Sequence, residues 1–146
     1  SGAFGVMAAI ILILLKVSAI AALSPTQSYA LVIAPIWGRW GQVLAIARYP
    51  YLKAEGKGAF HRRNLKLPQD LWPSLILLLI TVGTPMTIHP NAWTVWCGIA
   101  VAGFWISWGV GAWFNHRLQG MTGDSYGAIV EWTEALIICS VSILTK

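Results

Sequence analysis

Charged residues are scarce in this sequence, and acidic residues most of all. Asp and Glu together number 5 in a chain of 146 residues, and all charged residues make up 10%, whereas a soluble domain carries about 25%. Hydrophobic residues make up 57%. So few charges do not cover a soluble surface, which excludes a soluble enzyme, a disordered tail and a disulfide-rich secreted module. The composition indicates an integral membrane protein.

Motifs for zinc binding and for P-loop nucleotide binding are also missing. The 2 cysteines, Cys97 and Cys139, lie in separate apolar runs and form no CxxC or Cys/His spacing, so we expect inert buried thiols. The 3 histidines stand alone, without an HExxH sequence, and we expect no GxSxG nucleophile elbow of a hydrolase. These absences argue against zinc catalysis and against a P-loop nucleotide site.

Five apolar runs are long enough to cross a membrane, for which about 20 mostly apolar residues are needed. They cover residues 3–23, 29–47, 71–89, 92–114 and 126–144. The runs are continuous rather than alternating, so they predict helices and not the strands of a barrel. The sequence therefore predicts a single all-α domain, a polytopic membrane helical bundle of about five transmembrane helices.

Basic residues gather on one side of this predicted bundle. The loops at 48–70 and 115–124 hold seven of the ten Lys and Arg residues, and only Lys146 lies on the other side. Cytoplasmic loops carry an excess of Lys and Arg, so we expect both loops and the N-terminus to face the cytoplasm. The same asymmetry explains the net charge of +5 without a nucleic acid as partner.

Four charged residues fall inside the predicted spans. They are Lys16, Arg39, Glu131 and Glu134. A charge at the centre of a membrane helix costs about 2.5–3.5 kcal/mol on the insertion scale, so such residues are functional candidates. For Lys16 and Glu134 the alternative is an internal ion pair.

The segment 120–124, Gly-Met-Thr-Gly-Asp, combines a glycine-containing loop with the start of a helix. Thr122 or Asp124 can cap that helix, whose free N–H groups suit a phosphate. Asp124, Ala128 and Glu131 follow at spacings of four and three residues, which places them on one helix face. Carboxylates beside bound phosphate suit Mg²⁺. The alternative is a capped helix with a buried polar stripe.

A second cluster, residues 53–63, combines glycines with several cations. A diphosphate or a nucleotide suits such a loop. The alternative is an ordinary basic loop on the cytoplasmic side. From the residues alone, phosphoryl transfer on a membrane-associated substrate is the predicted chemistry, and its substrate is left open.

Residues 118–128, together with Glu131 and Glu134, resemble the LGGxTGDxxGAxxExxE signature of the cobalamin 5′-phosphate synthase family, also called adenosylcobinamide-GDP ribazoletransferases. Three further segments resemble that family in its order: 2–6, 38–39 and 51–58. The chain departs from the pattern at a few positions: Gln119 stands in place of Gly, Lys53 in place of Arg and Lys57 in place of Leu. The resemblance covers the whole chain, and the Thr-Gly-Asp block is its most specific part.

The resemblance implies an activity, a metal and partners. It implies a bacterial cytoplasmic-membrane transferase that joins α-ribazole or its 5′-phosphate to adenosylcobinamide-GDP with Mg²⁺ and releases GMP, late in cobalamin biosynthesis. It assigns Asp124 as a metal ligand or base partner and Glu131 as a second carboxylate. Candidates for substrate contacts are Arg39, Arg48, Lys53, Gly56, Gly58, Arg117, Thr122 and Gly123.

Family members carry an Asp-rich stretch just before the segment that resembles residues 2–6, so we expect this chain to be a C-terminal part of a longer protein. The sequence also leaves two alternative functions to consider. A CDP-alcohol phosphotransferase is disfavoured because its D-G-x-x-A-R signature is missing from this sequence. A transporter or channel subunit is disfavoured because most charges lie near the predicted cytoplasmic edge rather than at mid-membrane.

Overall fold

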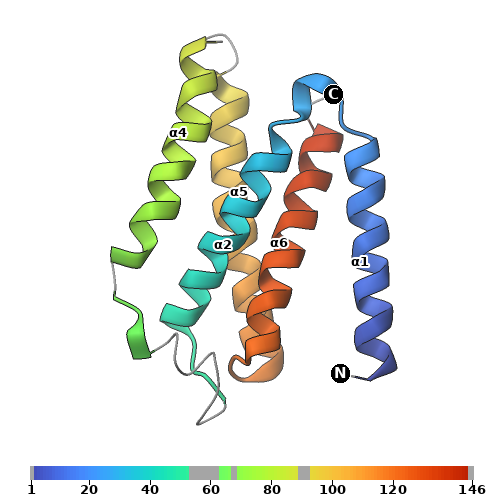
Figure 1. The fold of residues 1–146 in the computed structure, drawn as a ribbon, viewed down its shortest axis with the longest axis vertical. Coiled ribbons are helices and arrows are strands. Elements are labelled where there is room, and N and C mark those ends of the chain that lie inside the picture. Colours follow the sequence, from blue (N-terminus) through green and yellow to red (C-terminus); the bar gives the residue numbers. More distant parts are fainter. Residues whose placement is uncertain (1, 53–62, 67–68, 89–92, 145–146) are drawn as a thin grey trace.

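The computed structural model shows an all-helical bundle (Figure 1) and describes residues 2–52, 63–66, 69–88 and 93–144. Its elements are α1 (Ala3–Ala21), η1 (Pro25–Gln27), α2 (Ala30–Arg48), η2 (Gln69–Leu71), α4 (Trp72–Ile88), α5 (Trp93–Leu118) and α6 (Gly123–Leu144). Within these ranges there is no β-strand, so the all-α prediction is confirmed. Each of the five long helices overlaps one predicted span.

In the described part of the chain, four helical stretches are long and apolar enough to cross a membrane: α1, Pro25–Arg48, α5 and α6 up to Ile143. The remaining predicted span, 71–89, forms α4, but the apolar stretch there, Gln69–Thr84, is shorter than the other four. The predicted ends also shift. Helix α5 continues to Leu118 and α6 already begins at Gly123. The 115–124 segment, predicted to be a loop, is therefore mostly helical.

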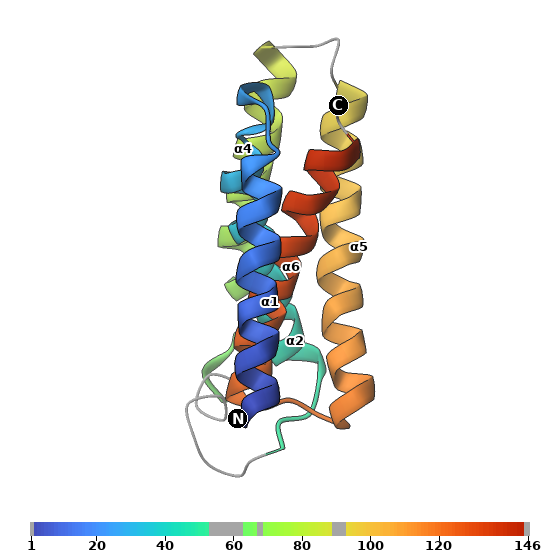
Figure 2. The same cartoon turned by 90° about the vertical axis from the view of Figure 1, so that its right-hand side faces the viewer.

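Helices α2 and α6 form the centre of the bundle. Helix α2 packs against α4, α5 and α6, whereas the main partner of α1 is α6 (Figures 1 and 2). Glycines let α2 approach its neighbours. A Cβ on Gly38 would lie 3.1 Å from Val130 Cγ1, and Gly103 leaves the space that the ring of Trp37 fills. Small residues at helix crossings are typical of membrane bundles, where packing replaces the hydrophobic effect.

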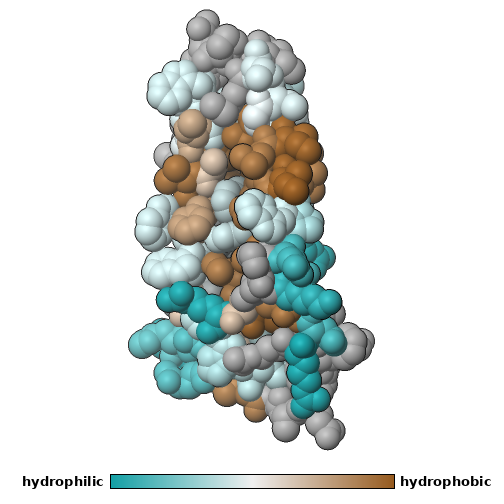
Figure 3. All heavy atoms as spheres, turned by 90° about the vertical axis from the view of Figure 1, so that its left-hand side faces the viewer, coloured by the Kyte–Doolittle hydropathy of each residue, from teal (hydrophilic) through white to brown (hydrophobic). Residues whose placement is uncertain are grey.

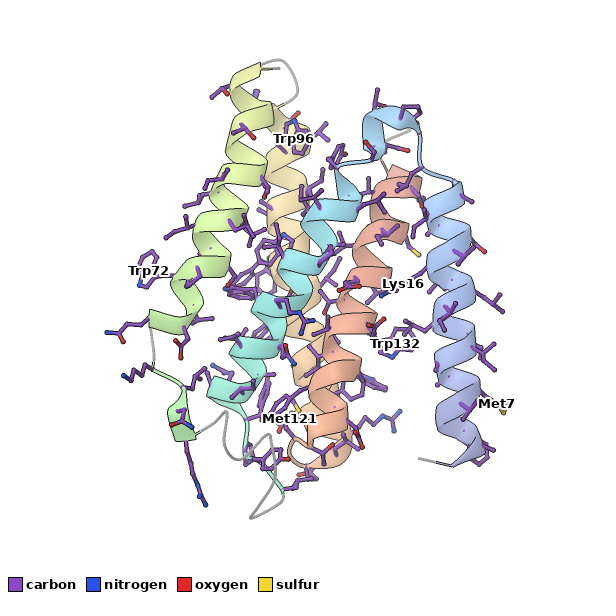
Figure 4. All side chains as sticks on the ribbon, in the orientation of Figure 1. Met7, Lys16, Trp72, Trp96, Met121 and Trp132 are labelled. Carbon is purple, nitrogen blue, oxygen red and sulfur yellow. The ribbon has the colours of Figure 1, made fainter. Side chains whose placement is uncertain are left out.

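The outer helices present apolar side chains away from the bundle. Phe4 is 87% exposed and Leu79 71%, and Figure 4 shows Met7 on α1 and Trp72 on α4 pointing outward. A water-soluble bundle does not leave such faces uncovered. The protein is therefore an integral membrane protein with apolar surfaces suited to lipid.

Polar residues gather at one end of the bundle. The N-terminus, the end of α2, the start of α4 and the α5–α6 turn all lie at this end, and the C-terminus lies at the other (Figures 1 and 2). On the face that Figure 3 shows, hydrophilic residues occupy the lower end and hydrophobic ones lie above them. This arrangement agrees with the predicted grouping of the loops. We call this the polar end.

Candidate functional site

Backbone hydrogen bonds join the two segments that were predicted to meet at the polar end. The N–H of Leu52 donates to the carbonyl of Met121 at 2.8 Å, and the N–H of Met121 donates to the carbonyl of Pro50 at 2.7 Å. Met121 is fully buried. The rings of Tyr51 and Tyr126 stack with centroids 5.9 Å apart. The chain after α2 and the chain before α6 are thus one structural unit.

The turn before α6 uses unusual backbone conformations. Gln119 has φ 56° and Gly120 has φ 150°. A Cβ on Gly120 would lie 2.5 Å from Leu52 Cδ2, so the joined segments leave no room for a side chain there. Residues other than glycine rarely adopt positive φ. This explains why the signature that this stretch resembles has glycine at both positions.

Thr122 caps α6, which is one of the two predicted alternatives. Its Oγ1 accepts from the N–H of Ser125 at 3.3 Å, and Ser125 Oγ accepts from the N–H of Thr122 at 2.8 Å. This reciprocal pair satisfies free donors at the helix start. Asp124 is not needed for the cap. Within the described part of the chain no hydrogen bond or ion pair engages its exposed carboxylate.

The same segment corrects our expectation that the sequence has no GxSxG pattern. Residues 123–127 read Gly-Asp-Ser-Tyr-Gly, the GxSxG pattern of a hydrolase nucleophile elbow, which requires an exposed Ser on a strand-to-helix turn. Ser125 instead lies in the first turn of α6, is 4% exposed, and uses its hydroxyl in the cap. The structure therefore gives Ser125 a structural role.

Asp124, Ala128 and Glu131 share one face of α6, as their spacing predicted, and this face lines a groove against α1. The groove has a volume of about 600 Å³. Its α1 wall includes Gly5, Ala8 and Leu12, and its other wall adds Phe114 and Trp132. We call it the α1–α6 groove. It lies along the half of both helices that is nearer the polar end.

Lys16 reaches from α1 to two acidic residues of α6 (Figure 4). Its Nζ lies 2.6 Å from Glu131 Oε2 and 2.7 Å from Glu134 Oε2. The side chains of Lys16 and Glu134 are 17% and 19% exposed, and that of Glu131 is 56% exposed. The alternative of internal ion pairing is thus confirmed for Lys16 and Glu134. It also engages Glu131, which was predicted to serve the reaction.

Mg²⁺ fits this site only in part. Within the described residues no three His, Cys, Asp or Glu side chains come together to hold a metal ion. Mg²⁺ is commonly held by one or two carboxylates plus phosphate oxygens, and Asp124 and Glu131 both line the groove. Of these two, Asp124 is free and Glu131 is paired with Lys16. Asp124 is therefore the better candidate ligand for a metal that arrives with phosphate.

None of the predicted cationic contacts among the described residues lines the α1–α6 groove. Arg39 donates to Gln42 Oε1 at 3.1 Å and lines a separate recess of about 370 Å³ with Asn64 and Asp70. Arg117 lies over the ring of Trp113 at 5.8 Å. Arg48 is exposed at the end of α2. Lys53, Gly56 and Gly58 lie outside the described residues.

The sequence patterns did not identify the apolar and aromatic residues that form the walls of the groove. Trp132 and Phe114 line it, and the small residues of α1 leave its space open. A signal was present for one of them. Trp132 follows Asp124 and Ala128 at spacings of eight and four residues, which is the periodicity of one helix face. Phe114 comes from another helix, so no local spacing points to it.

The fold and the site define an integral membrane protein with two joined loops and a carboxylate-lined groove at its polar end. The chain belongs to the cobalamin-5-phosphate synthase family, whose profile matches residues 1–142. This agrees with the resemblance seen in the sequence.

Curated relatives from cyanobacteria are similar along the whole chain. The adenosylcobinamide-GDP ribazoletransferase of Synechococcus elongatus is 48% identical over 143 residues, which are 98% of this chain and 56% of that protein. The proteins of the same name from Trichormus variabilis and Synechocystis sp. are 46% and 45% identical and are covered to 58% and 56%. The chain thus spans about half the length of these relatives. No solved structure matches it.

Proposed function

We propose that this chain is part of a transferase that joins ribazole, or its 5′-phosphate, to adenosylcobinamide-GDP and releases GMP late in cobalamin biosynthesis. Family membership supports the reaction class, since the relatives carry the name adenosylcobinamide-GDP ribazoletransferase. The observation that carries the assignment to this region is the free carboxylate of Asp124. It lies at the capped start of α6 and lines the α1–α6 groove.

The reaction is a phosphoryl transfer in which a ribose hydroxyl attacks the phosphorus next to cobinamide. A bond forms between the hydroxyl oxygen and that phosphorus, and the bond from the phosphorus to the bridging oxygen breaks. The electron pair leaves with GMP, and the hydroxyl proton passes to a carboxylate and then to solvent. We assign Asp124 to accept this proton or to position the hydroxyl.

Positioning and charge neutralisation supply most of the catalysis in phosphoryl transfer. Asp124 is the carboxylate that we assign to hold Mg²⁺, which would neutralise negative charge on the transferred group when it is bound with the substrate diphosphate. Arg48 and Arg117 at the polar end are the described cations that we assign to the diphosphate, with Lys53, Gly56 and Gly58 as further candidates. Arg39, Thr122 and Gly123 complete the proposed contact set.

We further propose that the polar end faces the cytoplasm of a bacterial cell and that the helices cross its inner membrane. The excess of Lys and Arg in the two loops at this end supports this orientation. The donor carries a charged diphosphate, which agrees with a site near the cytoplasmic surface.

The test is the change Asp124→Asn in the full-length protein, assayed by release of GMP and by mass spectrometry of the cobalamin product. We expect turnover to fall by at least about 100-fold, the lower range for loss of an acid–base group. Because Asn keeps the shape of Asp and Thr122 makes the cap, the melting temperature should change little. Undiminished turnover would remove Asp124 from the reaction.

A further inference from the structure

The α1–α6 groove has two chemically different ends. Asp124, in the first turn of α6, and Gly5, near the start of α1, lie at the polar end. Toward the other end Glu131 lines the groove and is bound by Lys16, one helical turn beyond Leu12. The groove therefore opens toward the polar end and is bounded farther in by an ion pair that links α1 to α6.

The walls between these ends are apolar and partly aromatic. Ala8 and Ala9 on α1 face Ala128 on α6, and these short side chains leave the space unfilled. Phe114 and Trp132 add two ring systems. Phe114 packs its ring on Trp113, whereas no ring contact holds Trp132 within the described part of the chain. A flat apolar molecule is the kind of ligand that such walls accept.

The charge of the groove selects against an anion. Its lining includes two carboxylates and no Lys or Arg side chain among the described residues. The nearby Lys16 is shared by Glu131 and Glu134, so the three together carry one net negative charge. Inside the groove a diphosphate without a bound cation would be repelled, whereas Asp124, at the open end, can still hold Mg²⁺ that arrives with a diphosphate outside the groove. Hydroxyl groups of a neutral sugar would instead donate hydrogen bonds to the carboxylates.

We propose that the α1–α6 groove binds the nucleoside acceptor, an inference that rests on the proposed function. Ribazole is a riboside of a substituted benzimidazole, so it has an apolar flat base and a hydroxyl-bearing sugar. The base lies against Trp132 and Phe114, and the ribose hydroxyls face Asp124 near the open end. A volume of about 600 Å³ lies within the usual range of small-molecule sites. The anionic donor approaches from the Arg-bearing segments outside the groove.

Direct binding tests this proposal without requiring turnover. The dissociation constant of a benzimidazole riboside is measured by equilibrium dialysis with the full-length protein in lipid nanodiscs. The change Ala8→Leu fills the groove from an exposed position on α1, and we expect it to weaken binding at least tenfold. The matched control is Ala21→Leu, the same change at an exposed position at the other end of α1. It should leave binding unchanged.

A second pair of variants tests the aromatic wall. Base–aromatic stacking contributes about 1–3 kcal/mol per base, so Trp132→Leu should weaken binding of the riboside about tenfold. The control is Trp72→Leu, because Trp72 is 54% exposed and points away from the bundle (Figure 4). Free guanosine diphosphate, offered as a competing probe, should not displace the riboside.

The outcomes separate this inference from the proposed function. Weakened binding in both groove variants, with both controls intact, supports the acceptor site. If Ala8→Leu and Trp132→Leu leave the dissociation constant of the riboside unchanged, the groove assignment is overturned, but the proposed reaction is not. Displacement by guanosine diphosphate would make the groove a donor site instead. No riboside binding by a protein that also fails to release GMP would overturn both.

Discussion

At the residue scale, different residues at the start of α6 cap the helix and offer a carboxylate to a ligand. Thr122 and Ser125 satisfy the free backbone donors of the helix through their hydroxyls. Asp124, between them, is left exposed and without a partner in the described part of the chain. An acidic residue in the first turn also interacts favourably with the helix dipole. The carboxylate is thus held in place by its backbone and free to meet a ligand.

Among the described residues, Gln119 is the one residue other than glycine with a positive φ. Its φ of 56° costs a residue other than glycine about 1–2 kcal/mol. A glycine at this position avoids that cost, but it loses more backbone entropy on folding, which offsets part of the stabilisation. We expect Gln119→Gly to raise the free energy of unfolding by about 0.5–1 kcal/mol, measured by denaturant or thermal unfolding in detergent. The opposite change, Gly120→Ala, serves as control and should destabilise through contact with Leu52. A lower stability of Gln119→Gly would show that its bond to the His116 carbonyl at 2.9 Å outweighs the backbone cost.

At the element scale, the attachment of α1 depends on α6. Most large side chains of α1 are exposed, and only Leu12 and Ala19 are buried. The Lys16 ion pairs with Glu131 and Glu134 are therefore the main polar link between α1 and the rest of the bundle. They also keep one wall of the groove in place.

Removal of Lys16 should destabilise the protein. Most of this loss should come from Glu134, which is the more buried of the two carboxylates left without a partner. Loss of one partner from a buried ion pair costs about 3–5 kcal/mol, and the part exposure of this cluster places Lys16→Met near the lower value. Glu134→Gln should cost more than Glu131→Gln, since Glu134 is 19% exposed and Glu131 is 56% exposed. The measurement is equilibrium unfolding of purified variants.

The double variant Lys16→Met/Glu134→Gln is the control for this cluster. It removes both the cation and the more buried carboxylate, so it should be more stable than Lys16→Met alone. Additive losses in this double-mutant cycle would mean that the two residues do not interact, in conflict with their 2.7 Å contact.

At the scale of the whole molecule, the two ends of the bundle differ in the residues they carry. The joined loops, the open end of the groove and the exposed Arg48 and Arg117 lie at the polar end. The opposite end carries η1 and the C-terminus (Figure 1). The proposed reaction requires the polar end to meet the compartment that holds the substrates.

Chemical labelling tests this orientation. In a background in which Cys97 and Cys139 are replaced by Ser, Thr26→Cys places a thiol in η1 and His116→Cys places one near the polar end. A membrane-impermeant maleimide added to spheroplasts should label Thr26→Cys, and should label His116→Cys only after permeabilisation. The variant without cysteine controls for background. The reverse pattern would place the proposed site outside the cytoplasm.

Much of this arrangement could be predicted from the sequence, because it depends on local periodicity and composition. Apolar runs predict helices, since only internally bonded backbone is stable in lipid. The spacing of Asp124, Ala128 and Glu131 places them on one face of one helix, wherever that helix packs. Helix ends were less predictable. The 115–124 segment is mostly helical because a single tight turn at Gln119 and Gly120 suffices to reverse the chain.

Contacts between helices were decided by the tertiary structure alone. The sequence by itself determined that Lys16, Arg39, Glu131 and Glu134 lie within apolar segments, and that the Thr-Gly-Asp stretch opens a helix. Only the fold decided that Lys16 pairs with both glutamates, that Arg39 lies in another recess, and that α1 and Phe114 complete the groove. The reason is physical. Which faces meet depends on close packing summed over whole helices, whereas a local pattern records only which side chains share a face.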